Sequence, residues 1–312
     1  MAGGLTATLA ELATPARVQK LRRGVVPAAA VLAFFLFLLL TFPYDMIARR
    51  IEVEAARAGA ELSIGSIGGR WLFGVRARDV RLRLSGAPGD PVTDLRFDRV
   101  DVSPDLFALL LRRTSFGFAL QAYGGNAKGH ASLSSDPKLP GLSSLRLDAP
   151  DLDVHALPLK DLAGVEGSGR ASLKIDVSSL QPVDAAAGTL SLTGRQLGVA
   201  GGNVAGFPLP RTSLGDVDAA VTIDKGQARL DRAQARGGDM EAEADGNVRL
   251  RPLLSLSQAD LHARFRPADR WLNENSMIKG AMGFLQNGKQ SDGSYAFSFS
   301  GPLAHLTPRP GR

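Results

Sequence analysis

The stretch GGDMEAEADGNVRL, Gly237 to Leu250, is the first candidate for chemistry, because acids occupy every second position in its middle. Four of its residues fall at the offsets that an EF-hand uses for its first calcium ligands and its invariant glycine: Glu241, Glu243, Asp245 and Gly246. The twelfth position of such a loop is a bidentate glutamate, but here it is Pro252. The alternation of apolar residues with these acids predicts a strand with an acidic face toward solvent. We therefore expect no metal ion here, and a turn at Asp245-Gly246-Asn247.

Other residue types associated with catalysis form no convincing constellation. The four histidines lie far apart and outside any H-E-x-x-H pattern: His130, His155, His262 and His305. The segments 135–138 and 276–279 match the S-x-x-K motif of penicillin-binding enzymes, but no K-T-G follows either one. The chain has no cysteine, which excludes disulfides, thiolate metal sites and cysteine nucleophiles. We therefore expect a protein that is not an enzyme, without catalytic, cofactor-binding or metal-binding residues.

Composition narrows the classes of partner. The chain has 312 residues, 44% hydrophobic and 6% aromatic, which suffices for one large domain or two ordinary ones. Its formal net charge is +6, and about half of that excess lies within residues 1–24. The rest is too dilute for a nucleic-acid footprint, which needs Lys and Arg clustered on one face. We therefore expect no nucleic-acid partner.

An apolar run long enough to cross a membrane comes early in the chain. From Val25 to Phe42 there is no charged residue, and such a helix at about 1.5 Å per residue approaches the ~30 Å thickness of a bilayer core. The following TFPYDMIARR offers no small-residue cleavage site, which disfavours a removable signal peptide. We predict an uncleaved transmembrane anchor over residues 24–43, and a membrane-lipid contact through it. The anchor residues include Val25, Leu32, Phe35, Phe37, Leu40 and Phe42.

The charges around this span predict its orientation. Four basic residues precede it, within the range in which positive charge retains a segment in the cytoplasm: Arg17, Lys20, Arg22 and Arg23. Three arginines follow the span, so the asymmetry is modest. We expect a single-pass protein of the bacterial inner membrane, with a cytoplasmic N-terminus and the main domain in the periplasm.

The rest of the chain predicts a mainly β domain. Residues 44–59 have apolar residues at helical spacing and predict an amphipathic linker helix. After Gly59 the period changes to two, as in VRLRL, SLKIDV, DAAVTID and SYAFSFS, with turn residues between such runs. Strands with one apolar and one wet face are typical of antiparallel sheets. We expect a curved, mostly antiparallel, repeat-like sheet with successive strands paired to their neighbours.

At two points along the chain the apolar residues of the strand pattern move from odd to even positions. Two other segments lack the strand pattern and predict helices. The shifts near Asp79 and Asp98 each add one residue, which predicts β-bulges. The segment SPDLFALLLRR predicts a helix with Ser103 as its N-cap, and it is one candidate to cover the apolar face of the sheet. A second short helix is expected within PADRWLNENSMIKG, residues 267–280.

The order of these elements resembles the type II secretion system protein N family, which is in turn similar to AsmA-like periplasmic proteins. The resemblance covers nearly the whole chain. It rests on GAELSIGSIGGRWLFGVRARDVRL, on the run DKGQARLDRAQARGGDMEAEADGNVRL and on the closing SDGSYAFSFSGPL. These motifs are patterns of Gly, Asp and alternating apolar residues, so their order carries the likeness.

The resemblance implies a non-enzymatic subunit of the type II protein secretion machinery, acting by contacts with the inner-membrane platform or the secretin. The alternative is an AsmA-like protein that binds or transfers lipid in the cell envelope. The division expected along the chain is a cytoplasmic tail (1–23), the anchor (24–43), the linker helix (44–59), a β-rich periplasmic domain (60–301) and a C-terminal tail (302–312).

Overall fold

A computed structural model describes most of the chain after residue 59. The described ranges are 60–70, 74–84, 93–111, 113–134, 141–160, 164–180, 182–204, 210–252, 256–303 and 305–311, with 46, 49, 52, 53, 56, 136, 207 and 208. Residues Ala48–Arg312 form one compact unit, which is described here by itself. The predicted anchor and the basic residues before it lie outside the described residues. Within the described part, no helix combines the length and the apolar character needed to span a bilayer.

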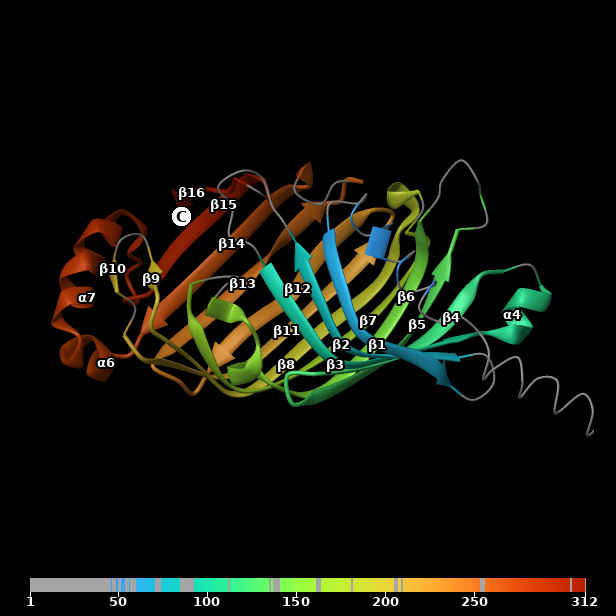
Figure 1. Ribbon diagram of the computed structural model, residues 1–312. Coiled ribbons are helices and arrows are strands. Elements are labelled where there is room, and N and C mark those ends of the chain that lie inside the picture. Colours follow the sequence, from blue (N-terminus) through green and yellow to red (C-terminus); the bar gives the residue numbers. More distant parts are fainter. Residues whose placement is uncertain are drawn as a thin grey trace, which may run out of the picture. The chain divides into compact units, whose positions relative to one another are not determined.

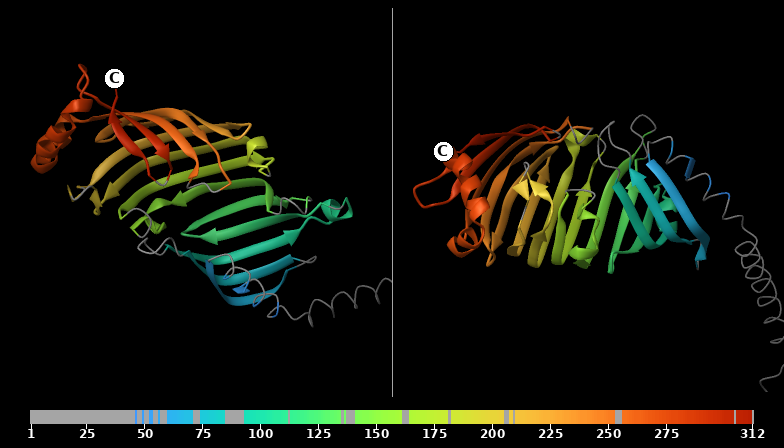
Figure 2. Two further views of the ribbon diagram at one scale, coloured as in Figure 1. Left: turned by 90° about the horizontal axis from the view of Figure 1, so that it is seen from above. Right: turned by 60° about the vertical axis from the view of Figure 1, so that its left-hand side comes forward.

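The domain is built on one curved antiparallel sheet of fourteen strands (Figures 1 and 2). The strands follow one another in chain order, except that β8 pairs directly with β11. They are β1 (Ala60–Arg70), β2 (Gly74–Leu84), β3 (Thr93–Pro104), β4 (Ser115–Ala122), β5 (Gly125–Leu133), β6 (Leu142–Asp153), β7 (Glu166–Ser178), β8 (Ala187–Ala200), β11 (Thr212–Asp224), β12 (Gln227–Arg236), β13 (Met240–Arg249), β14 (Gln258–Pro267), β15 (Tyr295–Pro302) and β16 (Thr307–Pro310). The prediction of a mainly β, antiparallel and neighbour-paired sheet is confirmed.

Short elements occupy the connections between strands. The two-residue strands β9 (Asn203–Val204) and β10 (Phe207–Pro208) form a hairpin between β8 and β11. The 3-10 turns η1 (Val154–Ala156) and η2 (Val183–Ala185) follow β6 and β7. Between β14 and β15 lie α6 (Asp269–Glu274), α7 (Ser276–Ala281) and η4 (Met282–Gly288), so the second predicted helix is present but broken at Asn275.

The former calcium-loop candidate is strand β13. Its residues alternate without exception between partly buried and exposed, and the acids fall on the exposed face. The prediction of a strand is confirmed, but the expected turn at Asp245-Gly246-Asn247 is wrong. Gly246 lies inside β13 and pairs with both Leu230 and Leu261, and the turn before β13 is made by Gly237 and its neighbours.

The two pattern shifts near Asp79 and Asp98 are real, but the prediction of bulges there is wrong. Arg78 pairs with Arg99 and Val80 pairs with Phe97, so β2 and β3 keep the same register on both sides of the shift. On the other side of β2, Gly65 of β1 stands opposite Asp79, again without a change of register. Gly65, Asp79 and Asp98 therefore lie opposite one another on three neighbouring strands. At this level the apolar side chains of all three strands move from one face of the sheet to the other. Asp79 makes this possible with a left-handed backbone, φ 52°.

True register shifts occur elsewhere in the sheet. Between β11 and β12, Ala220 pairs with Arg232 but Val221 pairs with Leu230, so Asp231 is the extra residue. A related shift appears on the other side of β12, where Leu230 pairs with Gly246 and Ala233 with Ala244. Such shifts add local twist and bend the sheet.

The last strand forms an edge of the sheet with a distinctive sequence, Thr-Pro-Arg-Pro. The N–H of Gly311 donates to the carbonyl of Ala296 on β15 at 2.8 Å. Because N–H groups alternate in direction along a strand, Pro308 and Pro310 occupy the positions that face away from β15. Within the described residues the sheet thus includes Thr307–Pro310, part of the predicted C-terminal tail, and the outward positions of this edge strand carry no N–H.

Candidate functional site

One line of paired residues crosses the whole sheet, and every member of it is apolar or glycine. Each residue is the direct cross-strand partner of the next, with one residue from each of the fourteen strands. This central row comprises Gly69, Val75, Val102, Phe118, Gly129, Leu147, Ile175, Leu190, Val221, Leu230, Gly246, Leu261, Phe299 and Pro308. Because directly paired residues point to the same side of a sheet, the row is one continuous apolar surface.

A second line of paired residues runs beside the central row, and it consists largely of alanines. Its members from β8 to β15 are Leu192, Ala219, Ala233, Ala244, Ala263 and Phe297. These positions are two residues along each strand from the central row, or three on β12, where Asp231 is the extra residue, and they share its face. We call the central row and this alanine row together the apolar strip.

The apolar strip is less covered than the apolar residues on either side of it. The Val, Leu, Ile and Phe side chains of the central row are all partly exposed. On one side, Val177, Ile223 and Ala228 are buried, where they pack with Ala186 beside η2. On the other side, Ala235 and Tyr295 are buried. The covered margins and the partly open middle make the strip a candidate binding surface for something apolar.

The strip is long compared with a lipid chain. Fourteen strands at about 4.8 Å spacing extend the central row over roughly 60 Å, measured along the curved sheet. One leaflet of a bilayer core is about 15 Å thick, half of the ~30 Å hydrocarbon region. The row is therefore about four acyl-chain lengths long.

Aromatic rings line the C-terminal part of this face. Phe265 stacks on Tyr295 with ring centroids 5.5 Å apart, and on Phe297 with centroids 6.2 Å apart. The rings come from β14 and β15, next to Leu261 and Phe299 of the central row. They enlarge the apolar surface at that end.

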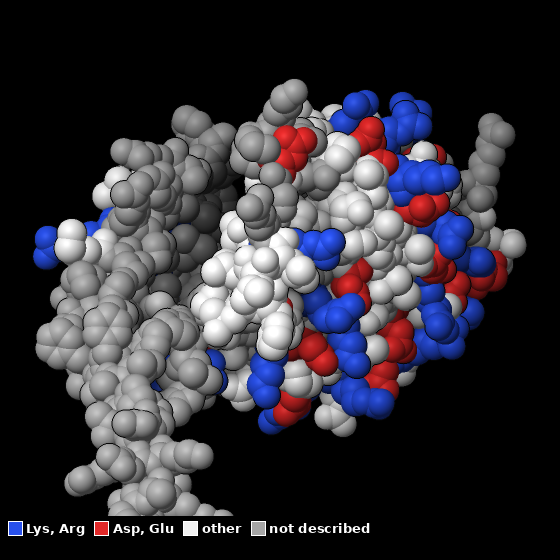
Figure 3. Space-filling view, turned by 90° about the vertical axis from the view of Figure 1, so that its right-hand side faces the viewer, with Lys and Arg blue, Asp and Glu red and all other residues white. Residues whose placement is uncertain are grey.

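The opposite face of the sheet is polar, with basic and acidic side chains interspersed on the part visible in Figure 3, and ion pairs cross it. Arg146 lies 2.7 Å from Asp176, and Arg170 lies 2.6 Å from Asp151. Asp101 is the most buried of these acids, 7% exposed, and accepts hydrogen bonds from Nε (2.6 Å) and Nη2 (3.1 Å) of Arg76. The hydrogen bond from Arg76 lowers the pKa of Asp101, against the effect of burial.

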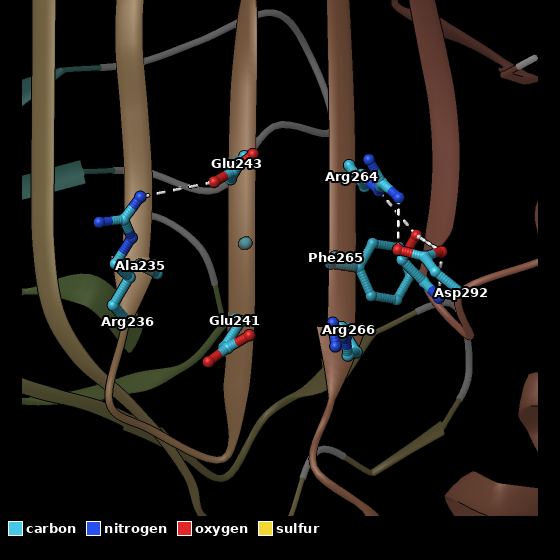
Figure 4. A pocket seen from close by; sticks show the side chains of 10 residues that line it. Ala235, Arg236, Glu241, Glu243, Arg264, Phe265, Arg266 and Asp292 are labelled. Atoms are coloured by element: carbon cyan, nitrogen blue, oxygen red, sulfur yellow. Dashed lines mark hydrogen bonds and ion pairs between the residues drawn. The ribbon is translucent and has the colours of Figure 1, made fainter. Parts of the chain in front are cut away.

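A pocket of about 360 Å³ on β12 to β14 also belongs to the polar face (Figure 4). Arg236 lies 3.7 Å from Glu243, and Arg264 contacts Asp292 and Ser294. The hydroxyl and the backbone N–H of Ser294 lower the pKa of Asp292 to about 2. Acids and bases in this pocket neutralise one another, so it resembles a solvated ion-pair network more than a catalytic cleft.

The other residues considered for chemistry are dispersed over the domain. Among the described residues, no three His, Asp or Glu side chains come together as a metal site. His130, His155, His262 and His305 are exposed at separate positions. Ser276 begins α7, and the amine of Lys279 donates to Asn273 at 2.9 Å. The anchor residues from Val25 to Phe42 and the basic residues from Arg17 to Arg23 lie outside the described residues.

Comparison of the chain with protein families, with curated proteins and with solved structures finds no significant match. The resemblance to the type II secretion protein N family therefore stays a prediction.

Proposed function

We propose that the apolar strip binds the hydrocarbon chains of membrane lipids, so that the protein is a lipid-binding protein of the cell envelope. The observation that carries this proposal is the central row, whose apolar side chains remain partly exposed from β2 to β15. Ile175, Leu190 and Val221 of the row pack against the buried cluster at its margin, so the row is partly covered. Soluble monomers rarely leave so long an apolar surface even partly exposed without a ligand or partner for it. A row of this length suits long, flexible chains better than a compact small molecule.

The helix expected to cover this face does not do so. Helix α4 (Leu106–Leu110) lies in the connection between β3 and β4, and its large apolar side chains are exposed. If α4 packed on the strip, those side chains would be buried against it. This outcome favours a foreign occupant of the strip over internal cover by α4.

The test maps where a lipid chain contacts the full-length protein. The chain is purified and incubated with a phospholipid that carries a diazirine in its acyl tail, irradiated, digested and analysed by mass spectrometry. We expect cross-links on peptides that contain Phe118, Ile175 and Leu190, and competition by excess unlabelled phospholipid. Cross-links confined to residues 25–42 would contradict the proposal, because they would report lipid around the predicted anchor alone.

A second candidate is a subunit of the type II secretion machinery, acting through its polar face on the platform or the secretin. The ion-paired polar face favours it, because charges of both signs suit specific protein contacts better than an anionic lipid surface. Deletion of the gene separates the two candidates. Exported enzymes trapped in the periplasm, with normal outer-membrane permeability, would support secretion. Unchanged export, together with cross-linked lipid on the strip, would support lipid binding.

Both candidates place the sheet domain outside the cytoplasm, held at the inner membrane by the predicted anchor. A reporter enzyme that is active only outside the cytoplasm, fused after Arg312, should be active. Activity of a cytoplasm-specific reporter at the same position would reverse the orientation.

A further inference from the structure

The tip between β3 and β4 carries the most exposed apolar side chains described in the structure. Phe107 is 86% exposed and Leu110 is 85% exposed, and the other large side chains of the tip are Leu106, Leu109 and Leu111. Residues 106–111 read LFALLL, without one polar side chain. Figure 3 looks onto the end of the domain where α4 lies in Figure 1, and uncharged atoms form its projecting part.

A helix that is apolar on every side is suited to an environment that is apolar on every side. A partner protein with a groove would bind one face of the helix and leave the others in water. The hydrocarbon of a bilayer surrounds an inserted tip completely. The exposed side chains of α4 point in several directions around its axis, since they occupy positions 106, 107, 109 and 110 of a helix with 3.6 residues per turn.

Several backbone N–H groups of the tip are hydrogen-bonded within the tip itself. This suits an apolar environment, where each unpaired polar group is costly. The carboxylate of Asp105 accepts from the N–H groups of Phe107 (3.0 Å) and Ala108 (3.1 Å). The N–H groups of Leu109, Leu111 and Arg113 donate to carbonyls within the same tip. The predicted N-cap Ser103 was wrong, because Ser103 and Pro104 belong to β3 and Asp105 caps the helix.

Charge and size agree with shallow insertion. Arg113 is exposed directly behind the tip, so a cation stands at the level where anionic headgroups would lie. The five-residue helix is about 8 Å long, shorter than one leaflet of about 15 Å. The apolar run at residues 25–42 independently predicts that the chain resides at a membrane.

We propose that the α4 tip inserts into the hydrocarbon region of an anionic bilayer and gives the sheet domain a contact with the membrane separate from the predicted anchor. This inference does not depend on lipid binding by the apolar strip. Pro104 pairs with Phe116, two residues along both strands from Val102 and Phe118 of the central row. An inserted tip would hold that end of the strip close to the bilayer surface.

The absence of cysteine permits a direct test. Full-length Leu110→Cys is labelled with the fluorophore NBD and reconstituted into vesicles of phosphatidylethanolamine and phosphatidylglycerol at 3:1. The matched control is Gln227→Cys, exposed at the start of β12. We expect a blue-shifted emission at position 110, and quenching by phospholipids that carry a nitroxide on the acyl chain, with neither effect at position 227.

Two outcomes would overturn the proposal. Emission at position 110 as red-shifted as at position 227 would show that the tip stays in water. A blue shift without nitroxide quenching would show that protein, from the same chain or a second copy, covers the tip in place of lipid. A further variant, Phe107→Glu in the Leu110→Cys background, should abolish quenching by lipid nitroxides, and retained quenching would also contradict insertion of the tip.

Discussion

The ring of Phe118 on β4 fills the space above Gly129 on β5 that a side chain there would need. A Cβ atom at Gly129 would stand 2.5 Å from Cζ of Phe118 and 2.2 Å from the carbonyl oxygen of Arg146. Both residues belong to the central row. The glycine therefore lets a large ring lie flat along the row instead of standing above it.

Replacing Gly129 by alanine should destabilise the domain, because the new methyl group meets a backbone carbonyl as well as the ring. We expect a loss of about 1–3 kcal/mol in the free energy of unfolding, the usual cost of overpacking. The control is Gly68→Ala on β1, where an added Cβ would meet nothing within 4 Å. Denaturant unfolding followed by circular dichroism measures both. Equal stability of Gly129→Ala and the parent would contradict the close packing.

The ion pair between Arg76 and Asp101 should matter more for stability than the exposed pairs of the same face. Removing Arg76 leaves the buried carboxylate of Asp101 without its two hydrogen bonds and with only the more distant Arg70, 3.7 Å away, as an ion-pair partner. A buried charge that loses its hydrogen bonds is costly. Arg76→Ala should therefore lower the melting temperature clearly. Arg146→Ala removes the partner of Asp176 where both side chains are exposed, and should change it little. A similar melting temperature for the two variants would count against this ranking.

Acid should lower the folding stability of the domain over a pH range set by the pKa values of its aspartates. The folded pKa of Asp292 is about 2, because Ser294 hydrogen-bonds to its carboxylate, and an unfolded aspartate has a pKa near 3.9. A lowered folded pKa means that the contribution to stability is complete above pH ~4 and is lost as the pH falls toward 2. Asp292→Asn should flatten the decline of melting temperature between pH 4 and 2. The same slope in parent and variant would show that Asp292 has no such role.

Filling the alanine row should block the binding of lipid chains without unfolding the sheet. Ala244 lies between Ala233 and Ala263 and is partly exposed, so Ala244→Phe places a ring on the apolar strip. We expect several-fold less acyl-chain cross-linking near this position. Asn247→Phe puts the same ring on the polar face of β13 and should leave cross-linking unchanged. Equal cross-linking in both variants would show that the alanine row is not part of the proposed lipid-binding surface.

The strands were predictable because each carries its own alternation of apolar and polar residues. Met240 to Arg249 shows this clearly, since the pattern there has no interruption. The central row was not predictable, because its continuity depends on the register of thirteen successive pairings. An extra residue such as Asp231 shifts that register, and the local pattern on one strand does not reveal what its neighbour does.

The α4 tip shows a second limit of prediction from the sequence. The apolar run predicted a helix, and a helix is present, but periodicity says nothing about which surface an apolar helix meets. Phe107 and Leu110 were expected to help bury the sheet, and they point into solvent. The signal available in the sequence was the lack of any polar residue in LFALLL, which is unusual for a helix that covers one face of a soluble domain.

The prolines of β16 make it harder for copies of this chain to pair through the edge of the sheet. An exposed strand with free N–H groups is a template on which another copy can add a strand, and repeated addition leads to fibres. Pro308 and Pro310 remove the outward donors at that edge, so a second molecule could pair there only through carbonyl acceptors. At the other edge, the N–H of Ile64 on β1 donates to the carboxylate of Glu52 at 3.1 Å, which occupies one donor that another strand would need. Open-ended polymerisation requires two compatible edges, and the edge formed by β16 lacks half of the hydrogen-bonding groups that it needs.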